Sequence, residues 1–167
     1  LEYDSDCVEM VRTMTDIQIE IGDITALDEP DLYYDLVCAF DVIEHVQDDA
    51  KAVSEMHRVC KKDGYVFITV PALQSLWSEH DVINHHFRRY TVSQIYDLFN
   101  GYGDKVLKRT FFNFILFVPT WLVRYFNRMK LPEKKDEIHS DFDRVGEKSL
   151  AAIILKSIFS FEKWWLK

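Results

Sequence analysis

The sequence predicts an α/β fold in which a mostly parallel sheet carries helices on both faces. A continuous apolar run at 36–40 and a run at 65–70 that is rich in β-forming residues have strand character, and a helical pattern separates them. A third stretch, 17–21, alternates isoleucine with polar residues, as a strand does. Because helices alternate with these strands, we expect parallel pairing with right-handed crossovers.

The first predicted helix covers about residues 6–14. Ser5 is its expected N-cap, and Val8 and Val11 form an apolar stripe along it. The strand at 17–21 follows, and a polar, proline-containing loop comes next. We therefore expect the chain to open in the order helix, strand, loop.

The run at 36–40 is too continuously apolar for a half-exposed strand, so we expect it to be buried on both faces, with Cys38 in the core. The next helix opens at Asp48 and Asp49, whose negative charge suits the positive end of the helix dipole. We expect the Asp-Gly pair at 63–64 to end it. Its predicted buried face consists of Ala52, Val53, Met56 and Val59.

The strand at 65–70 is expected to end at Pro71, which has no amide hydrogen for the ladder. A long connection, 72–90, shows no periodicity, and loops of this length in compact domains are often functional. Thr91 caps the next predicted helix, which ends at Gly101. Its apolar face consists of Ile95, Leu98 and Phe99.

The rest of the chain contains a predicted strand at 106–112, an apolar and aromatic run at 111–126, a charged linker at 130–148 and a helix at 150–166. The apolar run is too short and too interrupted for a membrane span, so it is either core packing or a surface that contacts a membrane or a lipid-like substrate. The residues that would suit such a surface are Trp121, Trp164 and Trp165.

Length and composition fit one globular domain, since 167 residues with 48% apolar content can bury a substantial core. A net charge of −8 argues against general nucleic-acid binding, because neutralising phosphates needs a basic surface. Three cysteines, an odd number without metal-type spacing, indicate a reducing compartment. We therefore expect a cytoplasmic protein, with peripheral membrane contact as the alternative.

Short motifs recur at the ends of the predicted strands. Glu2 is acidic, a Gly-Asp pair stands at 22–23, an Asp-x-x-Glu-His stretch occupies 41–45, and 57–71 reads as helix, turn and strand. Taken in this order, these motifs resemble the class I S-adenosylmethionine (SAM) dependent methyltransferases. Two further segments resemble the bacterial small-molecule branch of that family, and they are Leu76–Asp81 and His86–Tyr90.

The resemblance implies a Rossmann-like sheet and SAM as the cofactor. It also implies a first strand with a Gly-rich loop upstream of Glu2 and a last antiparallel strand downstream, and neither is present in this sequence. We therefore expect a truncated domain that is inactive alone. Residues 1–112 would be its incomplete core, and residues 113–167 a helical extension packed on it.

By resemblance, Glu2 binds the ribose, Asp23 and Ile24 hold the adenine, and Phe40 and Asp41 line the sulfonium end of SAM. A carboxylate offers two acceptor oxygens for the two ribose hydroxyls. An aromatic face and a carboxylate both favour a nearby cation. The alternatives are a solvated terminal glutamate, a turn aspartate, a core phenylalanine and a helix-capping aspartate.

Two adjacent residues, Glu44 and His45, follow the central predicted strand. His45 is the candidate general base, because the unperturbed pKa of histidine lies near neutrality. The alternative is that both residues only order the loop.

The connection 72–90 is crowded with histidine and arginine. By resemblance it covers the acceptor, and a guanidinium matches a carboxylate or phosphate group, with structural ion pairing as the alternative. Imidazole and carboxylate groups could also bind a metal, but their spacing here matches no metal motif, so we expect no metal site. The predicted acceptor-binding residues are His80, His86, Arg88 and Arg89, and the metal candidates that we set aside are His80, Asp81, His85 and His86.

These features together predict SAM-dependent methyl transfer to an oxygen, nitrogen or carbon atom of a small molecule. One alternative is a noncatalytic methyltransferase-like binding domain. The other is an NAD-linked Rossmann enzyme, because an acidic residue at Glu2 suits both cofactors. The Gly-Asp pair at 22–23 favours SAM.

Overall fold

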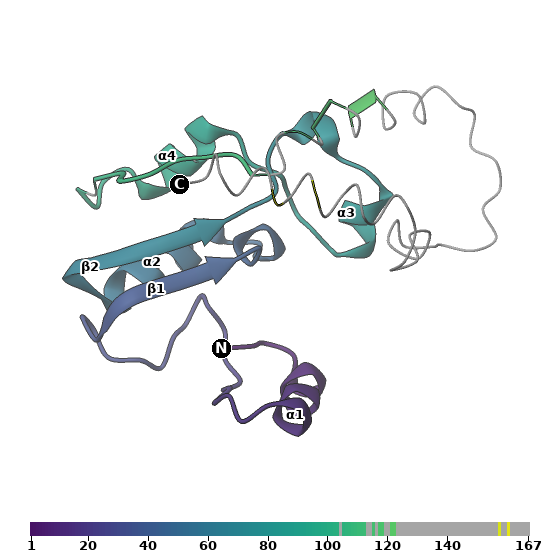
Figure 1. Ribbon diagram of the computed structural model, residues 1–167. Coiled ribbons are helices and arrows are strands. Elements are labelled where there is room, and N and C mark those ends of the chain that lie inside the picture. Colours follow the sequence, from purple (N-terminus) through teal and green to yellow (C-terminus); the bar gives the residue numbers. More distant parts are fainter. Residues whose placement is uncertain are drawn as a thin grey trace. The chain divides into compact units, whose positions relative to one another are not determined.

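A computed structural model describes residues 1–103 and 105–112, together with positions 115, 117, 118, 121, 122, 157 and 160. Residues 1–74 and 85–104 form one compact unit, and residues 75–84 and 105–167 form a second. The elements are α1 (Ser5–Met14), β1 (Tyr34–Phe40), η1 (Ile43–His45), α2 (Asp49–Val59), β2 (Cys60–Thr69), η2 (Gln74–Leu76), α3 (Glu79–Ile83) and α4 (Val92–Phe99) (Figure 1).

Helix α1 begins one residue earlier than its sequence pattern suggests. Asp4, not Ser5, is the N-cap, and its Oδ1 accepts hydrogen bonds from the backbone N–H of Asp6 at 2.8 Å and of Cys7 at 3.3 Å. Val8 is the buried residue of the helix, as the apolar stripe predicts. A carboxylate is a stronger acceptor than a hydroxyl at this position, which explains why the cap moves to the aspartate.

The strand predicted at 17–21 is wrong over most of its length. Only Ile21 pairs, in an isolated parallel bridge with Glu2. The backbone N–H of Glu2 donates to Glu20 O, and that of Gly22 donates to Glu2 O, both at 2.9 Å. An alternating pattern supports a strand only where a partner of matching length exists, and here the partner is a single residue.

Strands β1 and β2 form a parallel pair, as predicted, with Leu36 opposite Tyr65 and Phe40 opposite Thr69 (Figure 1). The pairing is shifted between Tyr34, which faces Cys60, and Leu36. Residues 61–64 therefore bulge out of the ladder.

The predicted end of helix α2 at the Asp-Gly pair is wrong. The helix ends at Val59, because the backbone carbonyls of Arg58 and Val59 accept hydrogen bonds at 2.8 Å from the N–H groups of Leu32 and Tyr33 in the preceding loop. The chain then turns directly into β2. Gly64 lies inside that strand, where a Cβ would lie only 2.8 Å from the Sγ of Cys60, so the tight bulge requires glycine.

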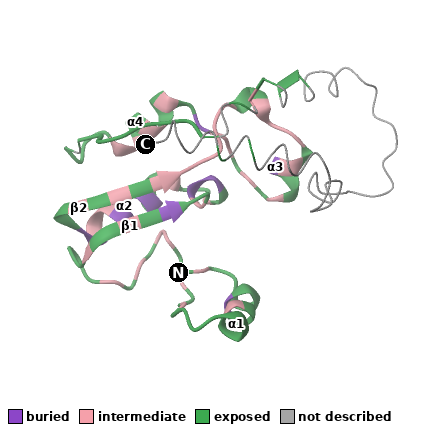
Figure 2. Cartoon of the chain, in the orientation of Figure 1, coloured by how far each residue is buried: buried purple, intermediate pink, exposed green. Residues whose placement is uncertain are grey.

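The core lies between the sheet and α2, whose predicted apolar face is fully buried (Figure 2). One side of the two-stranded sheet packs there through Val37, Val66 and Ile68. Helix α4 adds its own apolar face to the same cluster. The core residues of the cluster are Ala39, Ile43, Ala52, Met56 and Tyr90.

The other side of the sheet is exposed, so the prediction that β1 is buried on both faces is wrong for this structure. Cys38 is exposed, and Leu36 and Phe40 expose 55% and 56% of their surface. The reason is that continuous apolarity permits burial on two faces but does not supply the second layer. The α/β class and the parallel pairing are confirmed, and helices on both faces of the sheet stay a prediction.

The connection 72–90 contains two short helical segments, η2 and α3, instead of being wholly irregular. Ser78 and Asp81 form a capping box at the start of α3. Thr91 caps α4 as predicted, by accepting from the N–H of Gln94 at 3.3 Å. Gly101 follows with φ +108°, a conformation that glycine adopts without strain.

Three predictions concern the C-terminal part of the chain. The strand at 106–112 is wrong, because residues 105–112 adopt neither helix nor strand. The helical extension at 113–167, with most of its apolar run, lies almost entirely outside the described residues. Among the described residues, no helix has the length and apolarity needed to cross a membrane.

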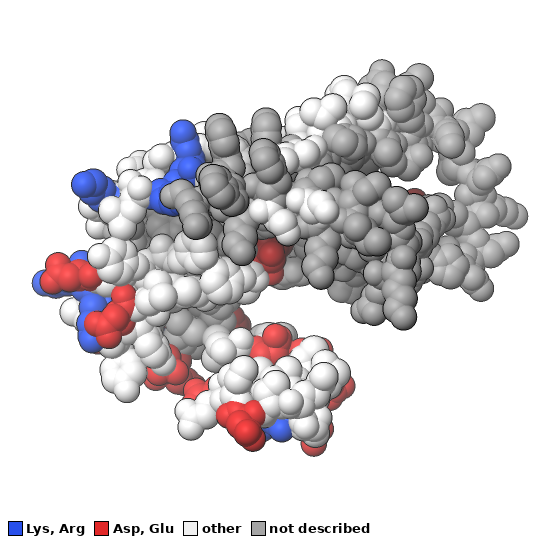
Figure 3. Space-filling view, viewed as in Figure 1, with Lys and Arg blue, Asp and Glu red and all other residues white. Residues whose placement is uncertain are grey.

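Acidic side chains gather around α1 (Figure 3). Asp4, Asp6 and Glu9 are all exposed there, and Arg12 is the one basic residue within the helix. This excess of acidic residues has the same sign as the net charge of the chain, which is −8. A surface of this sign repels polyanions.

Candidate functional site

The carboxyl end of β1 presents Phe40 and Asp41, two of the residues predicted to bind the cofactor. Asp41 has φ +51°, and its N–H donates to the carbonyl oxygen of Thr69 at 3.0 Å and to its Oγ1 at 3.1 Å. The backbone is thereby fixed to the end of β2 while the carboxylate remains exposed. The ring of Phe40 meets that of Phe67 edge-on, with centroids 5.4 Å apart. Ligands of open α/β sheets bind at such strand ends.

Glu2 pairs with Ile21 in the isolated bridge, and Asp23 comes two residues after Ile21. The Oε1 of Glu2 accepts from the N–H groups of Tyr3 at 2.8 Å and Asp4 at 3.1 Å. One oxygen of the Glu2 carboxylate is therefore hydrogen-bonded to the backbone of the two residues that follow it. The arrangement brings the predicted ribose and adenine residues to neighbouring positions.

Asp23 forms a local turn with Thr25. Its Oδ1 accepts from the backbone N–H and from the Oγ1 of Thr25, both at 2.8 Å. The hydrogen bond from the Thr25 backbone and, to a smaller extent, the one from its hydroxyl hold the pKa of the Asp23 carboxyl below its usual value. Ile24 is half-buried and packs against the core cluster, so it anchors the turn. Asp23 itself is an exposed, charged acceptor.

Glu44 is the most unusual residue of the region. Its side chain is completely buried, and neither carboxylate oxygen has a hydrogen-bond partner. Burial, with a smaller contribution from the charge of Asp41, raises the pKa of Glu44 to about 7 against the opposing effect of the Arg89 charge. A buried carboxyl with a strongly perturbed pKa at a strand end is typical of functional sites.

His45 and His86 lie beside this carboxylate. Their ring centroids are 4.6 Å apart and their planes nearly perpendicular, at 85°. One ligand atom from each of Glu44, His45 and His86 can be chosen so that all three lie within 4.8 Å of one another. His86 is 41 positions from His45 in the sequence, so only the fold reveals this group. The one signal in the sequence is that both segments follow ends of neighbouring parallel strands.

A set of hydrogen bonds holds the 86–90 segment against the residues that follow β1. The N–H of Phe87 donates to Glu44 O at 2.8 Å, and Nη2 of Arg88 donates to Gln47 O at 2.7 Å. The Tyr90 hydroxyl hydrogen-bonds with the Oδ2 of Asp49 at 2.8 Å. These contacts fix the position of His86.

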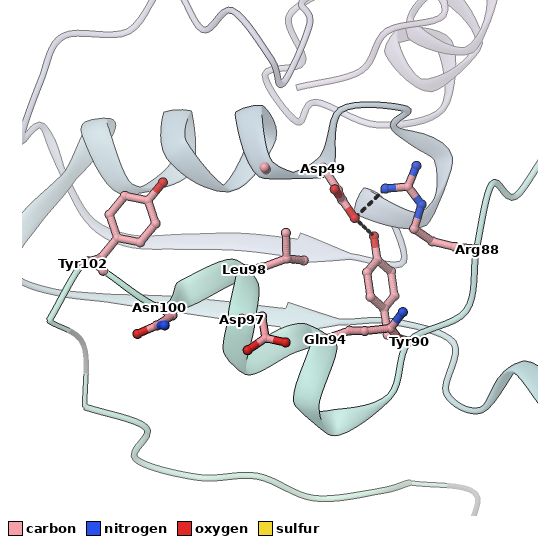
Figure 4. A pocket seen from close by; sticks show the side chains of 10 residues that line it. Asp49, Arg88, Tyr90, Gln94, Asp97, Leu98, Asn100 and Tyr102 are labelled. Atoms are coloured by element: carbon pink, nitrogen blue, oxygen red, sulfur yellow. Dashed lines mark hydrogen bonds and ion pairs between the residues drawn. The ribbon is translucent and has the colours of Figure 1, made fainter.

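Arg88 also forms an ion pair with Asp49. Figure 4 shows the Asp49 carboxylate contacting both Arg88 and the Tyr90 hydroxyl. Burial and the Asp49 carboxylate both raise the pKa of Tyr90 above its usual value. Asp49 and Tyr90 are therefore structural partners that the sequence analysis did not single out. The ion pair favours the structural reading of Arg88, and its predicted role in acceptor binding stays a prediction.

The other two predicted acceptor residues lie in different surroundings. Arg89 donates through Nη1 to Ala72 O at 3.3 Å and is close enough to Glu44 to lower its pKa. His80 lies in α3, in the second compact unit, where its Nε2 is 2.9 Å from Nδ2 of Asn84.

An open pocket lies between α2 and α4 (Figure 4). Of the residues predicted to bind cofactor or acceptor, only Arg88 lines it. Asp97, Leu98 and Tyr102 also line this pocket. The pocket is thus distinct from the strand-end residues, where charge and burial concentrate.

Comparison with known proteins shows what the first part of the chain is similar to. Residues 1–68 match the family described as "Methyltransferase domain". Over 72 residues, the chain is 38% identical to a Mycolicibacterium smegmatis protein named as a probable S-adenosylmethionine-dependent methyltransferase. That match covers 42% of this chain and 28% of the relative, so the chain spans well under half of that protein.

Two solved structures share the fold. A SAM-dependent methyltransferase of Thermotoga maritima matches with a TM-score of 0.54 and 20% identity, over 63% of this chain and 54% of that one. A methyltransferase solved with the Haloferax volcanii Trm112 activator matches with a TM-score of 0.53 and 19% identity, over 61% and 48%. At these identities the likeness shows the fold alone. The matches favour SAM over the NAD alternative. Residues 1–68 therefore match the methyltransferase domain family, in agreement with the resemblance that the sequence motifs predict.

Proposed function

We propose that the protein containing this chain transfers the methyl group of SAM to a small-molecule acceptor. The observation that carries the proposal is the placement of Asp23, Phe40 and Asp41 within the matching segment. All three are exposed at the ends of their segments, and the backbone of each aspartate is held in a defined turn. Methyl transfer needs the sulfonium and the acceptor atom in line, and rigid positioning supplies much of the rate.

In this proposal the adenosine half of SAM is bound by three residues. Glu2 accepts from the ribose hydroxyls, Asp23 accepts from the exocyclic amine of adenine, and the N–H of Ile24 donates to a ring nitrogen. Phe40 and Asp41 face the sulfonium, whose positive charge both an aromatic ring and a carboxylate stabilise.

The acceptor is proposed to bind beside the 86–90 segment. His45 is exposed and can remove a proton from an acceptor hydroxyl, while His86, Arg88 and Arg89 orient the acceptor. The acceptor-binding role predicted for His80, which belongs to the second compact unit, stays a prediction. The acceptor itself is a small molecule of unassigned class.

Replacing Asp23 by alanine in the complete protein should weaken SAM binding by about 1–3 kcal/mol, the range for leaving a buried polar partner unsatisfied. Titration calorimetry measures this directly. Asp28→Ala, which removes an exposed carboxylate from the neighbouring loop, is the matched control and should leave the affinity unchanged. Equal affinities for wild type and Asp23→Ala would remove this residue from the adenine site.

Replacing Arg89 by alanine should leave SAM affinity intact and lower turnover, because the residue is proposed to face the acceptor. Turnover is measured as release of demethylated SAM in the presence of a panel of small acceptors. Arg88→Ala is a less selective probe, since it also breaks the ion pair with Asp49. Loss of SAM binding in Arg89→Ala would assign this residue to the cofactor site or the fold. Binding of SAM by the wild type without any product would leave a noncatalytic domain as the function.

A further inference from the structure

We propose that Glu44, His45 and His86 form a binding site for a divalent transition-metal cation, with Zn²⁺ as its representative. The three residues offer two imidazole nitrogens and one carboxylate, a ligand set found in catalytic zinc and non-haem iron sites. The spacing of histidine and acidic residues within the 72–90 connection predicts no metal site. The group assembled by the fold draws two of its members from η1 instead.

The geometry is close to what a metal requires. Ligand atoms at the bond lengths of a tetrahedral zinc site lie about 3.4 Å apart. The three atoms here lie within 4.8 Å of one another. Binding of an ion therefore requires the three side chains to move closer together.

The second, independent observation is the buried carboxylate. Glu44 has no accessible surface, and both of its oxygens lack a partner, which is costly for a polar group in the protein interior. A cation bound by the adjacent imidazoles would satisfy one or both oxygens. Buried charges that are retained in folded proteins are usually paired or coordinate metals.

The backbone positions the ligands before any ion arrives. Glu44 and His45 are consecutive in the short helix η1, and the N–H of Phe87 donates to Glu44 O beside them. The ion pair between Arg88 and Asp49 holds the segment that carries His86. A site built on such supported elements loses little conformational entropy on binding.

The surrounding charges are balanced. Asp41 contributes negative charge near the carboxylate and Arg89 contributes positive charge. His45 is exposed and His86 is half-buried, so an ion can enter from solvent while Glu44 forms the floor of the site. Three protein ligands leave positions for water or a substrate oxygen, as in catalytic zinc sites.

The ligand set also selects the class of metal. Mg²⁺ and Ca²⁺ prefer oxygen ligands, whereas imidazole suits zinc, iron, cobalt and nickel. A metal on His45 would occupy a nitrogen lone pair that a general base needs. The metal role and the base role are therefore alternatives for that nitrogen, and metal binding can be measured without SAM or an acceptor.

The test is titration of the tag-free complete protein with Zn²⁺ by calorimetry, and with Co²⁺ by visible absorption. We expect one site, with affinity reduced roughly ten-fold or more in His86→Asn and in Glu44→Gln, since even the loss of an outer-shell partner costs that much. His85→Asn is the matched control, because it removes the neighbouring imidazole, and asparagine tolerates the φ of +56° at that position.

The pattern across the variants decides the proposal. Full affinity in His85→Asn with loss in His86→Asn and Glu44→Gln supports it. Equal affinity in His85→Asn and His86→Asn would overturn it, as would binding that Glu44→Gln leaves unchanged. Far-ultraviolet circular dichroism of each variant separates loss of a ligand from loss of the fold. Because the measurement contains no SAM, its failure would leave the proposed methyl transfer standing.

Discussion

Glu44→Gln should make the stability of the complete protein less dependent on pH. The folded pKa of Glu44 is raised to about 7 by burial, whereas a glutamate in the unfolded chain titrates near 4.3. Between these values the unfolded chain ionises and the folded protein retains the proton. The contribution of a group with a raised pKa is therefore complete at low pH and is lost as the pH rises toward 7.

The size of this effect follows from the pKa difference. From about pH 5 to about pH 8, the wild type should lose roughly 2–3 kcal/mol relative to Glu44→Gln. The quantity to follow is the difference between the two proteins in the free energy of unfolding, called the gap below. Burying the glutamine amide has the same cost at every pH, so it does not affect how this gap changes with pH. Urea unfolding at several pH values, with a chelator present, measures the gap.

The control for this prediction is Glu9→Gln, which neutralises an exposed glutamate on α1. Its stability should stay parallel to that of the wild type at every pH. A gap between wild type and Glu44→Gln that stays constant within a few tenths of a kcal/mol would show that Glu44 is not a buried, ionising group.

Arg58→Ala should destabilise the complete protein by about 3 kcal/mol, because one guanidinium joins α2 to the loop before β1. Its nitrogens donate to the carbonyls of Leu27 and Glu29, both at 2.7 Å, and to the carboxylate of Asp31 at 2.7 Å. They also contact both oxygens of Glu55, at 2.8 and 3.0 Å.

Glu55 explains why the loss should be large. Its side chain is only 10% exposed, and it accepts from the N–H of Leu27 at 2.9 Å as well as from Arg58. Removing the guanidinium leaves this buried carboxylate without its charged partner. Arg58 itself is 30% exposed, so the expected cost lies at the lower end of the range for fully buried pairs.

The pH dependence of this second effect has the opposite sign. Hydrogen bonds from Arg58 lower the pKa of Glu55 below its usual value. Its contribution is therefore present above the unfolded pKa near 4.3 and is lost as the pH falls through the folded value. The difference between wild type and Arg58→Ala should narrow in acid.

Arg58→Lys is the matched variant, since it keeps the charge but lacks the planar fork that reaches several acceptors at once. Its loss, measured by urea unfolding, should fall between wild type and alanine. A loss below about 1 kcal/mol in Arg58→Ala would show that the loop is held by other contacts.

The sequence by itself determined the elements whose signals are local. The helix after Asp48 has an apolar face of four residues, all of which are buried, and Thr91 caps α4 as its side chain predicts. The run ending at Phe40 pairs in parallel with the next strand because a helix connects them. Four motifs in order also sufficed for the resemblance to methyltransferases, which the match over residues 1–68 confirms.

The tertiary structure alone decided whatever depends on distant partners. Ile17 and Ile19 alternate like strand residues, yet only Ile21 finds a partner, and the exposed side of β1 shows that apolarity does not provide a covering layer. Likewise, nothing in the order of residues shows that Glu44 is buried or that His86 lies beside His45. Burial and side-chain proximity are properties of packing between segments, and they are absent from either segment taken alone.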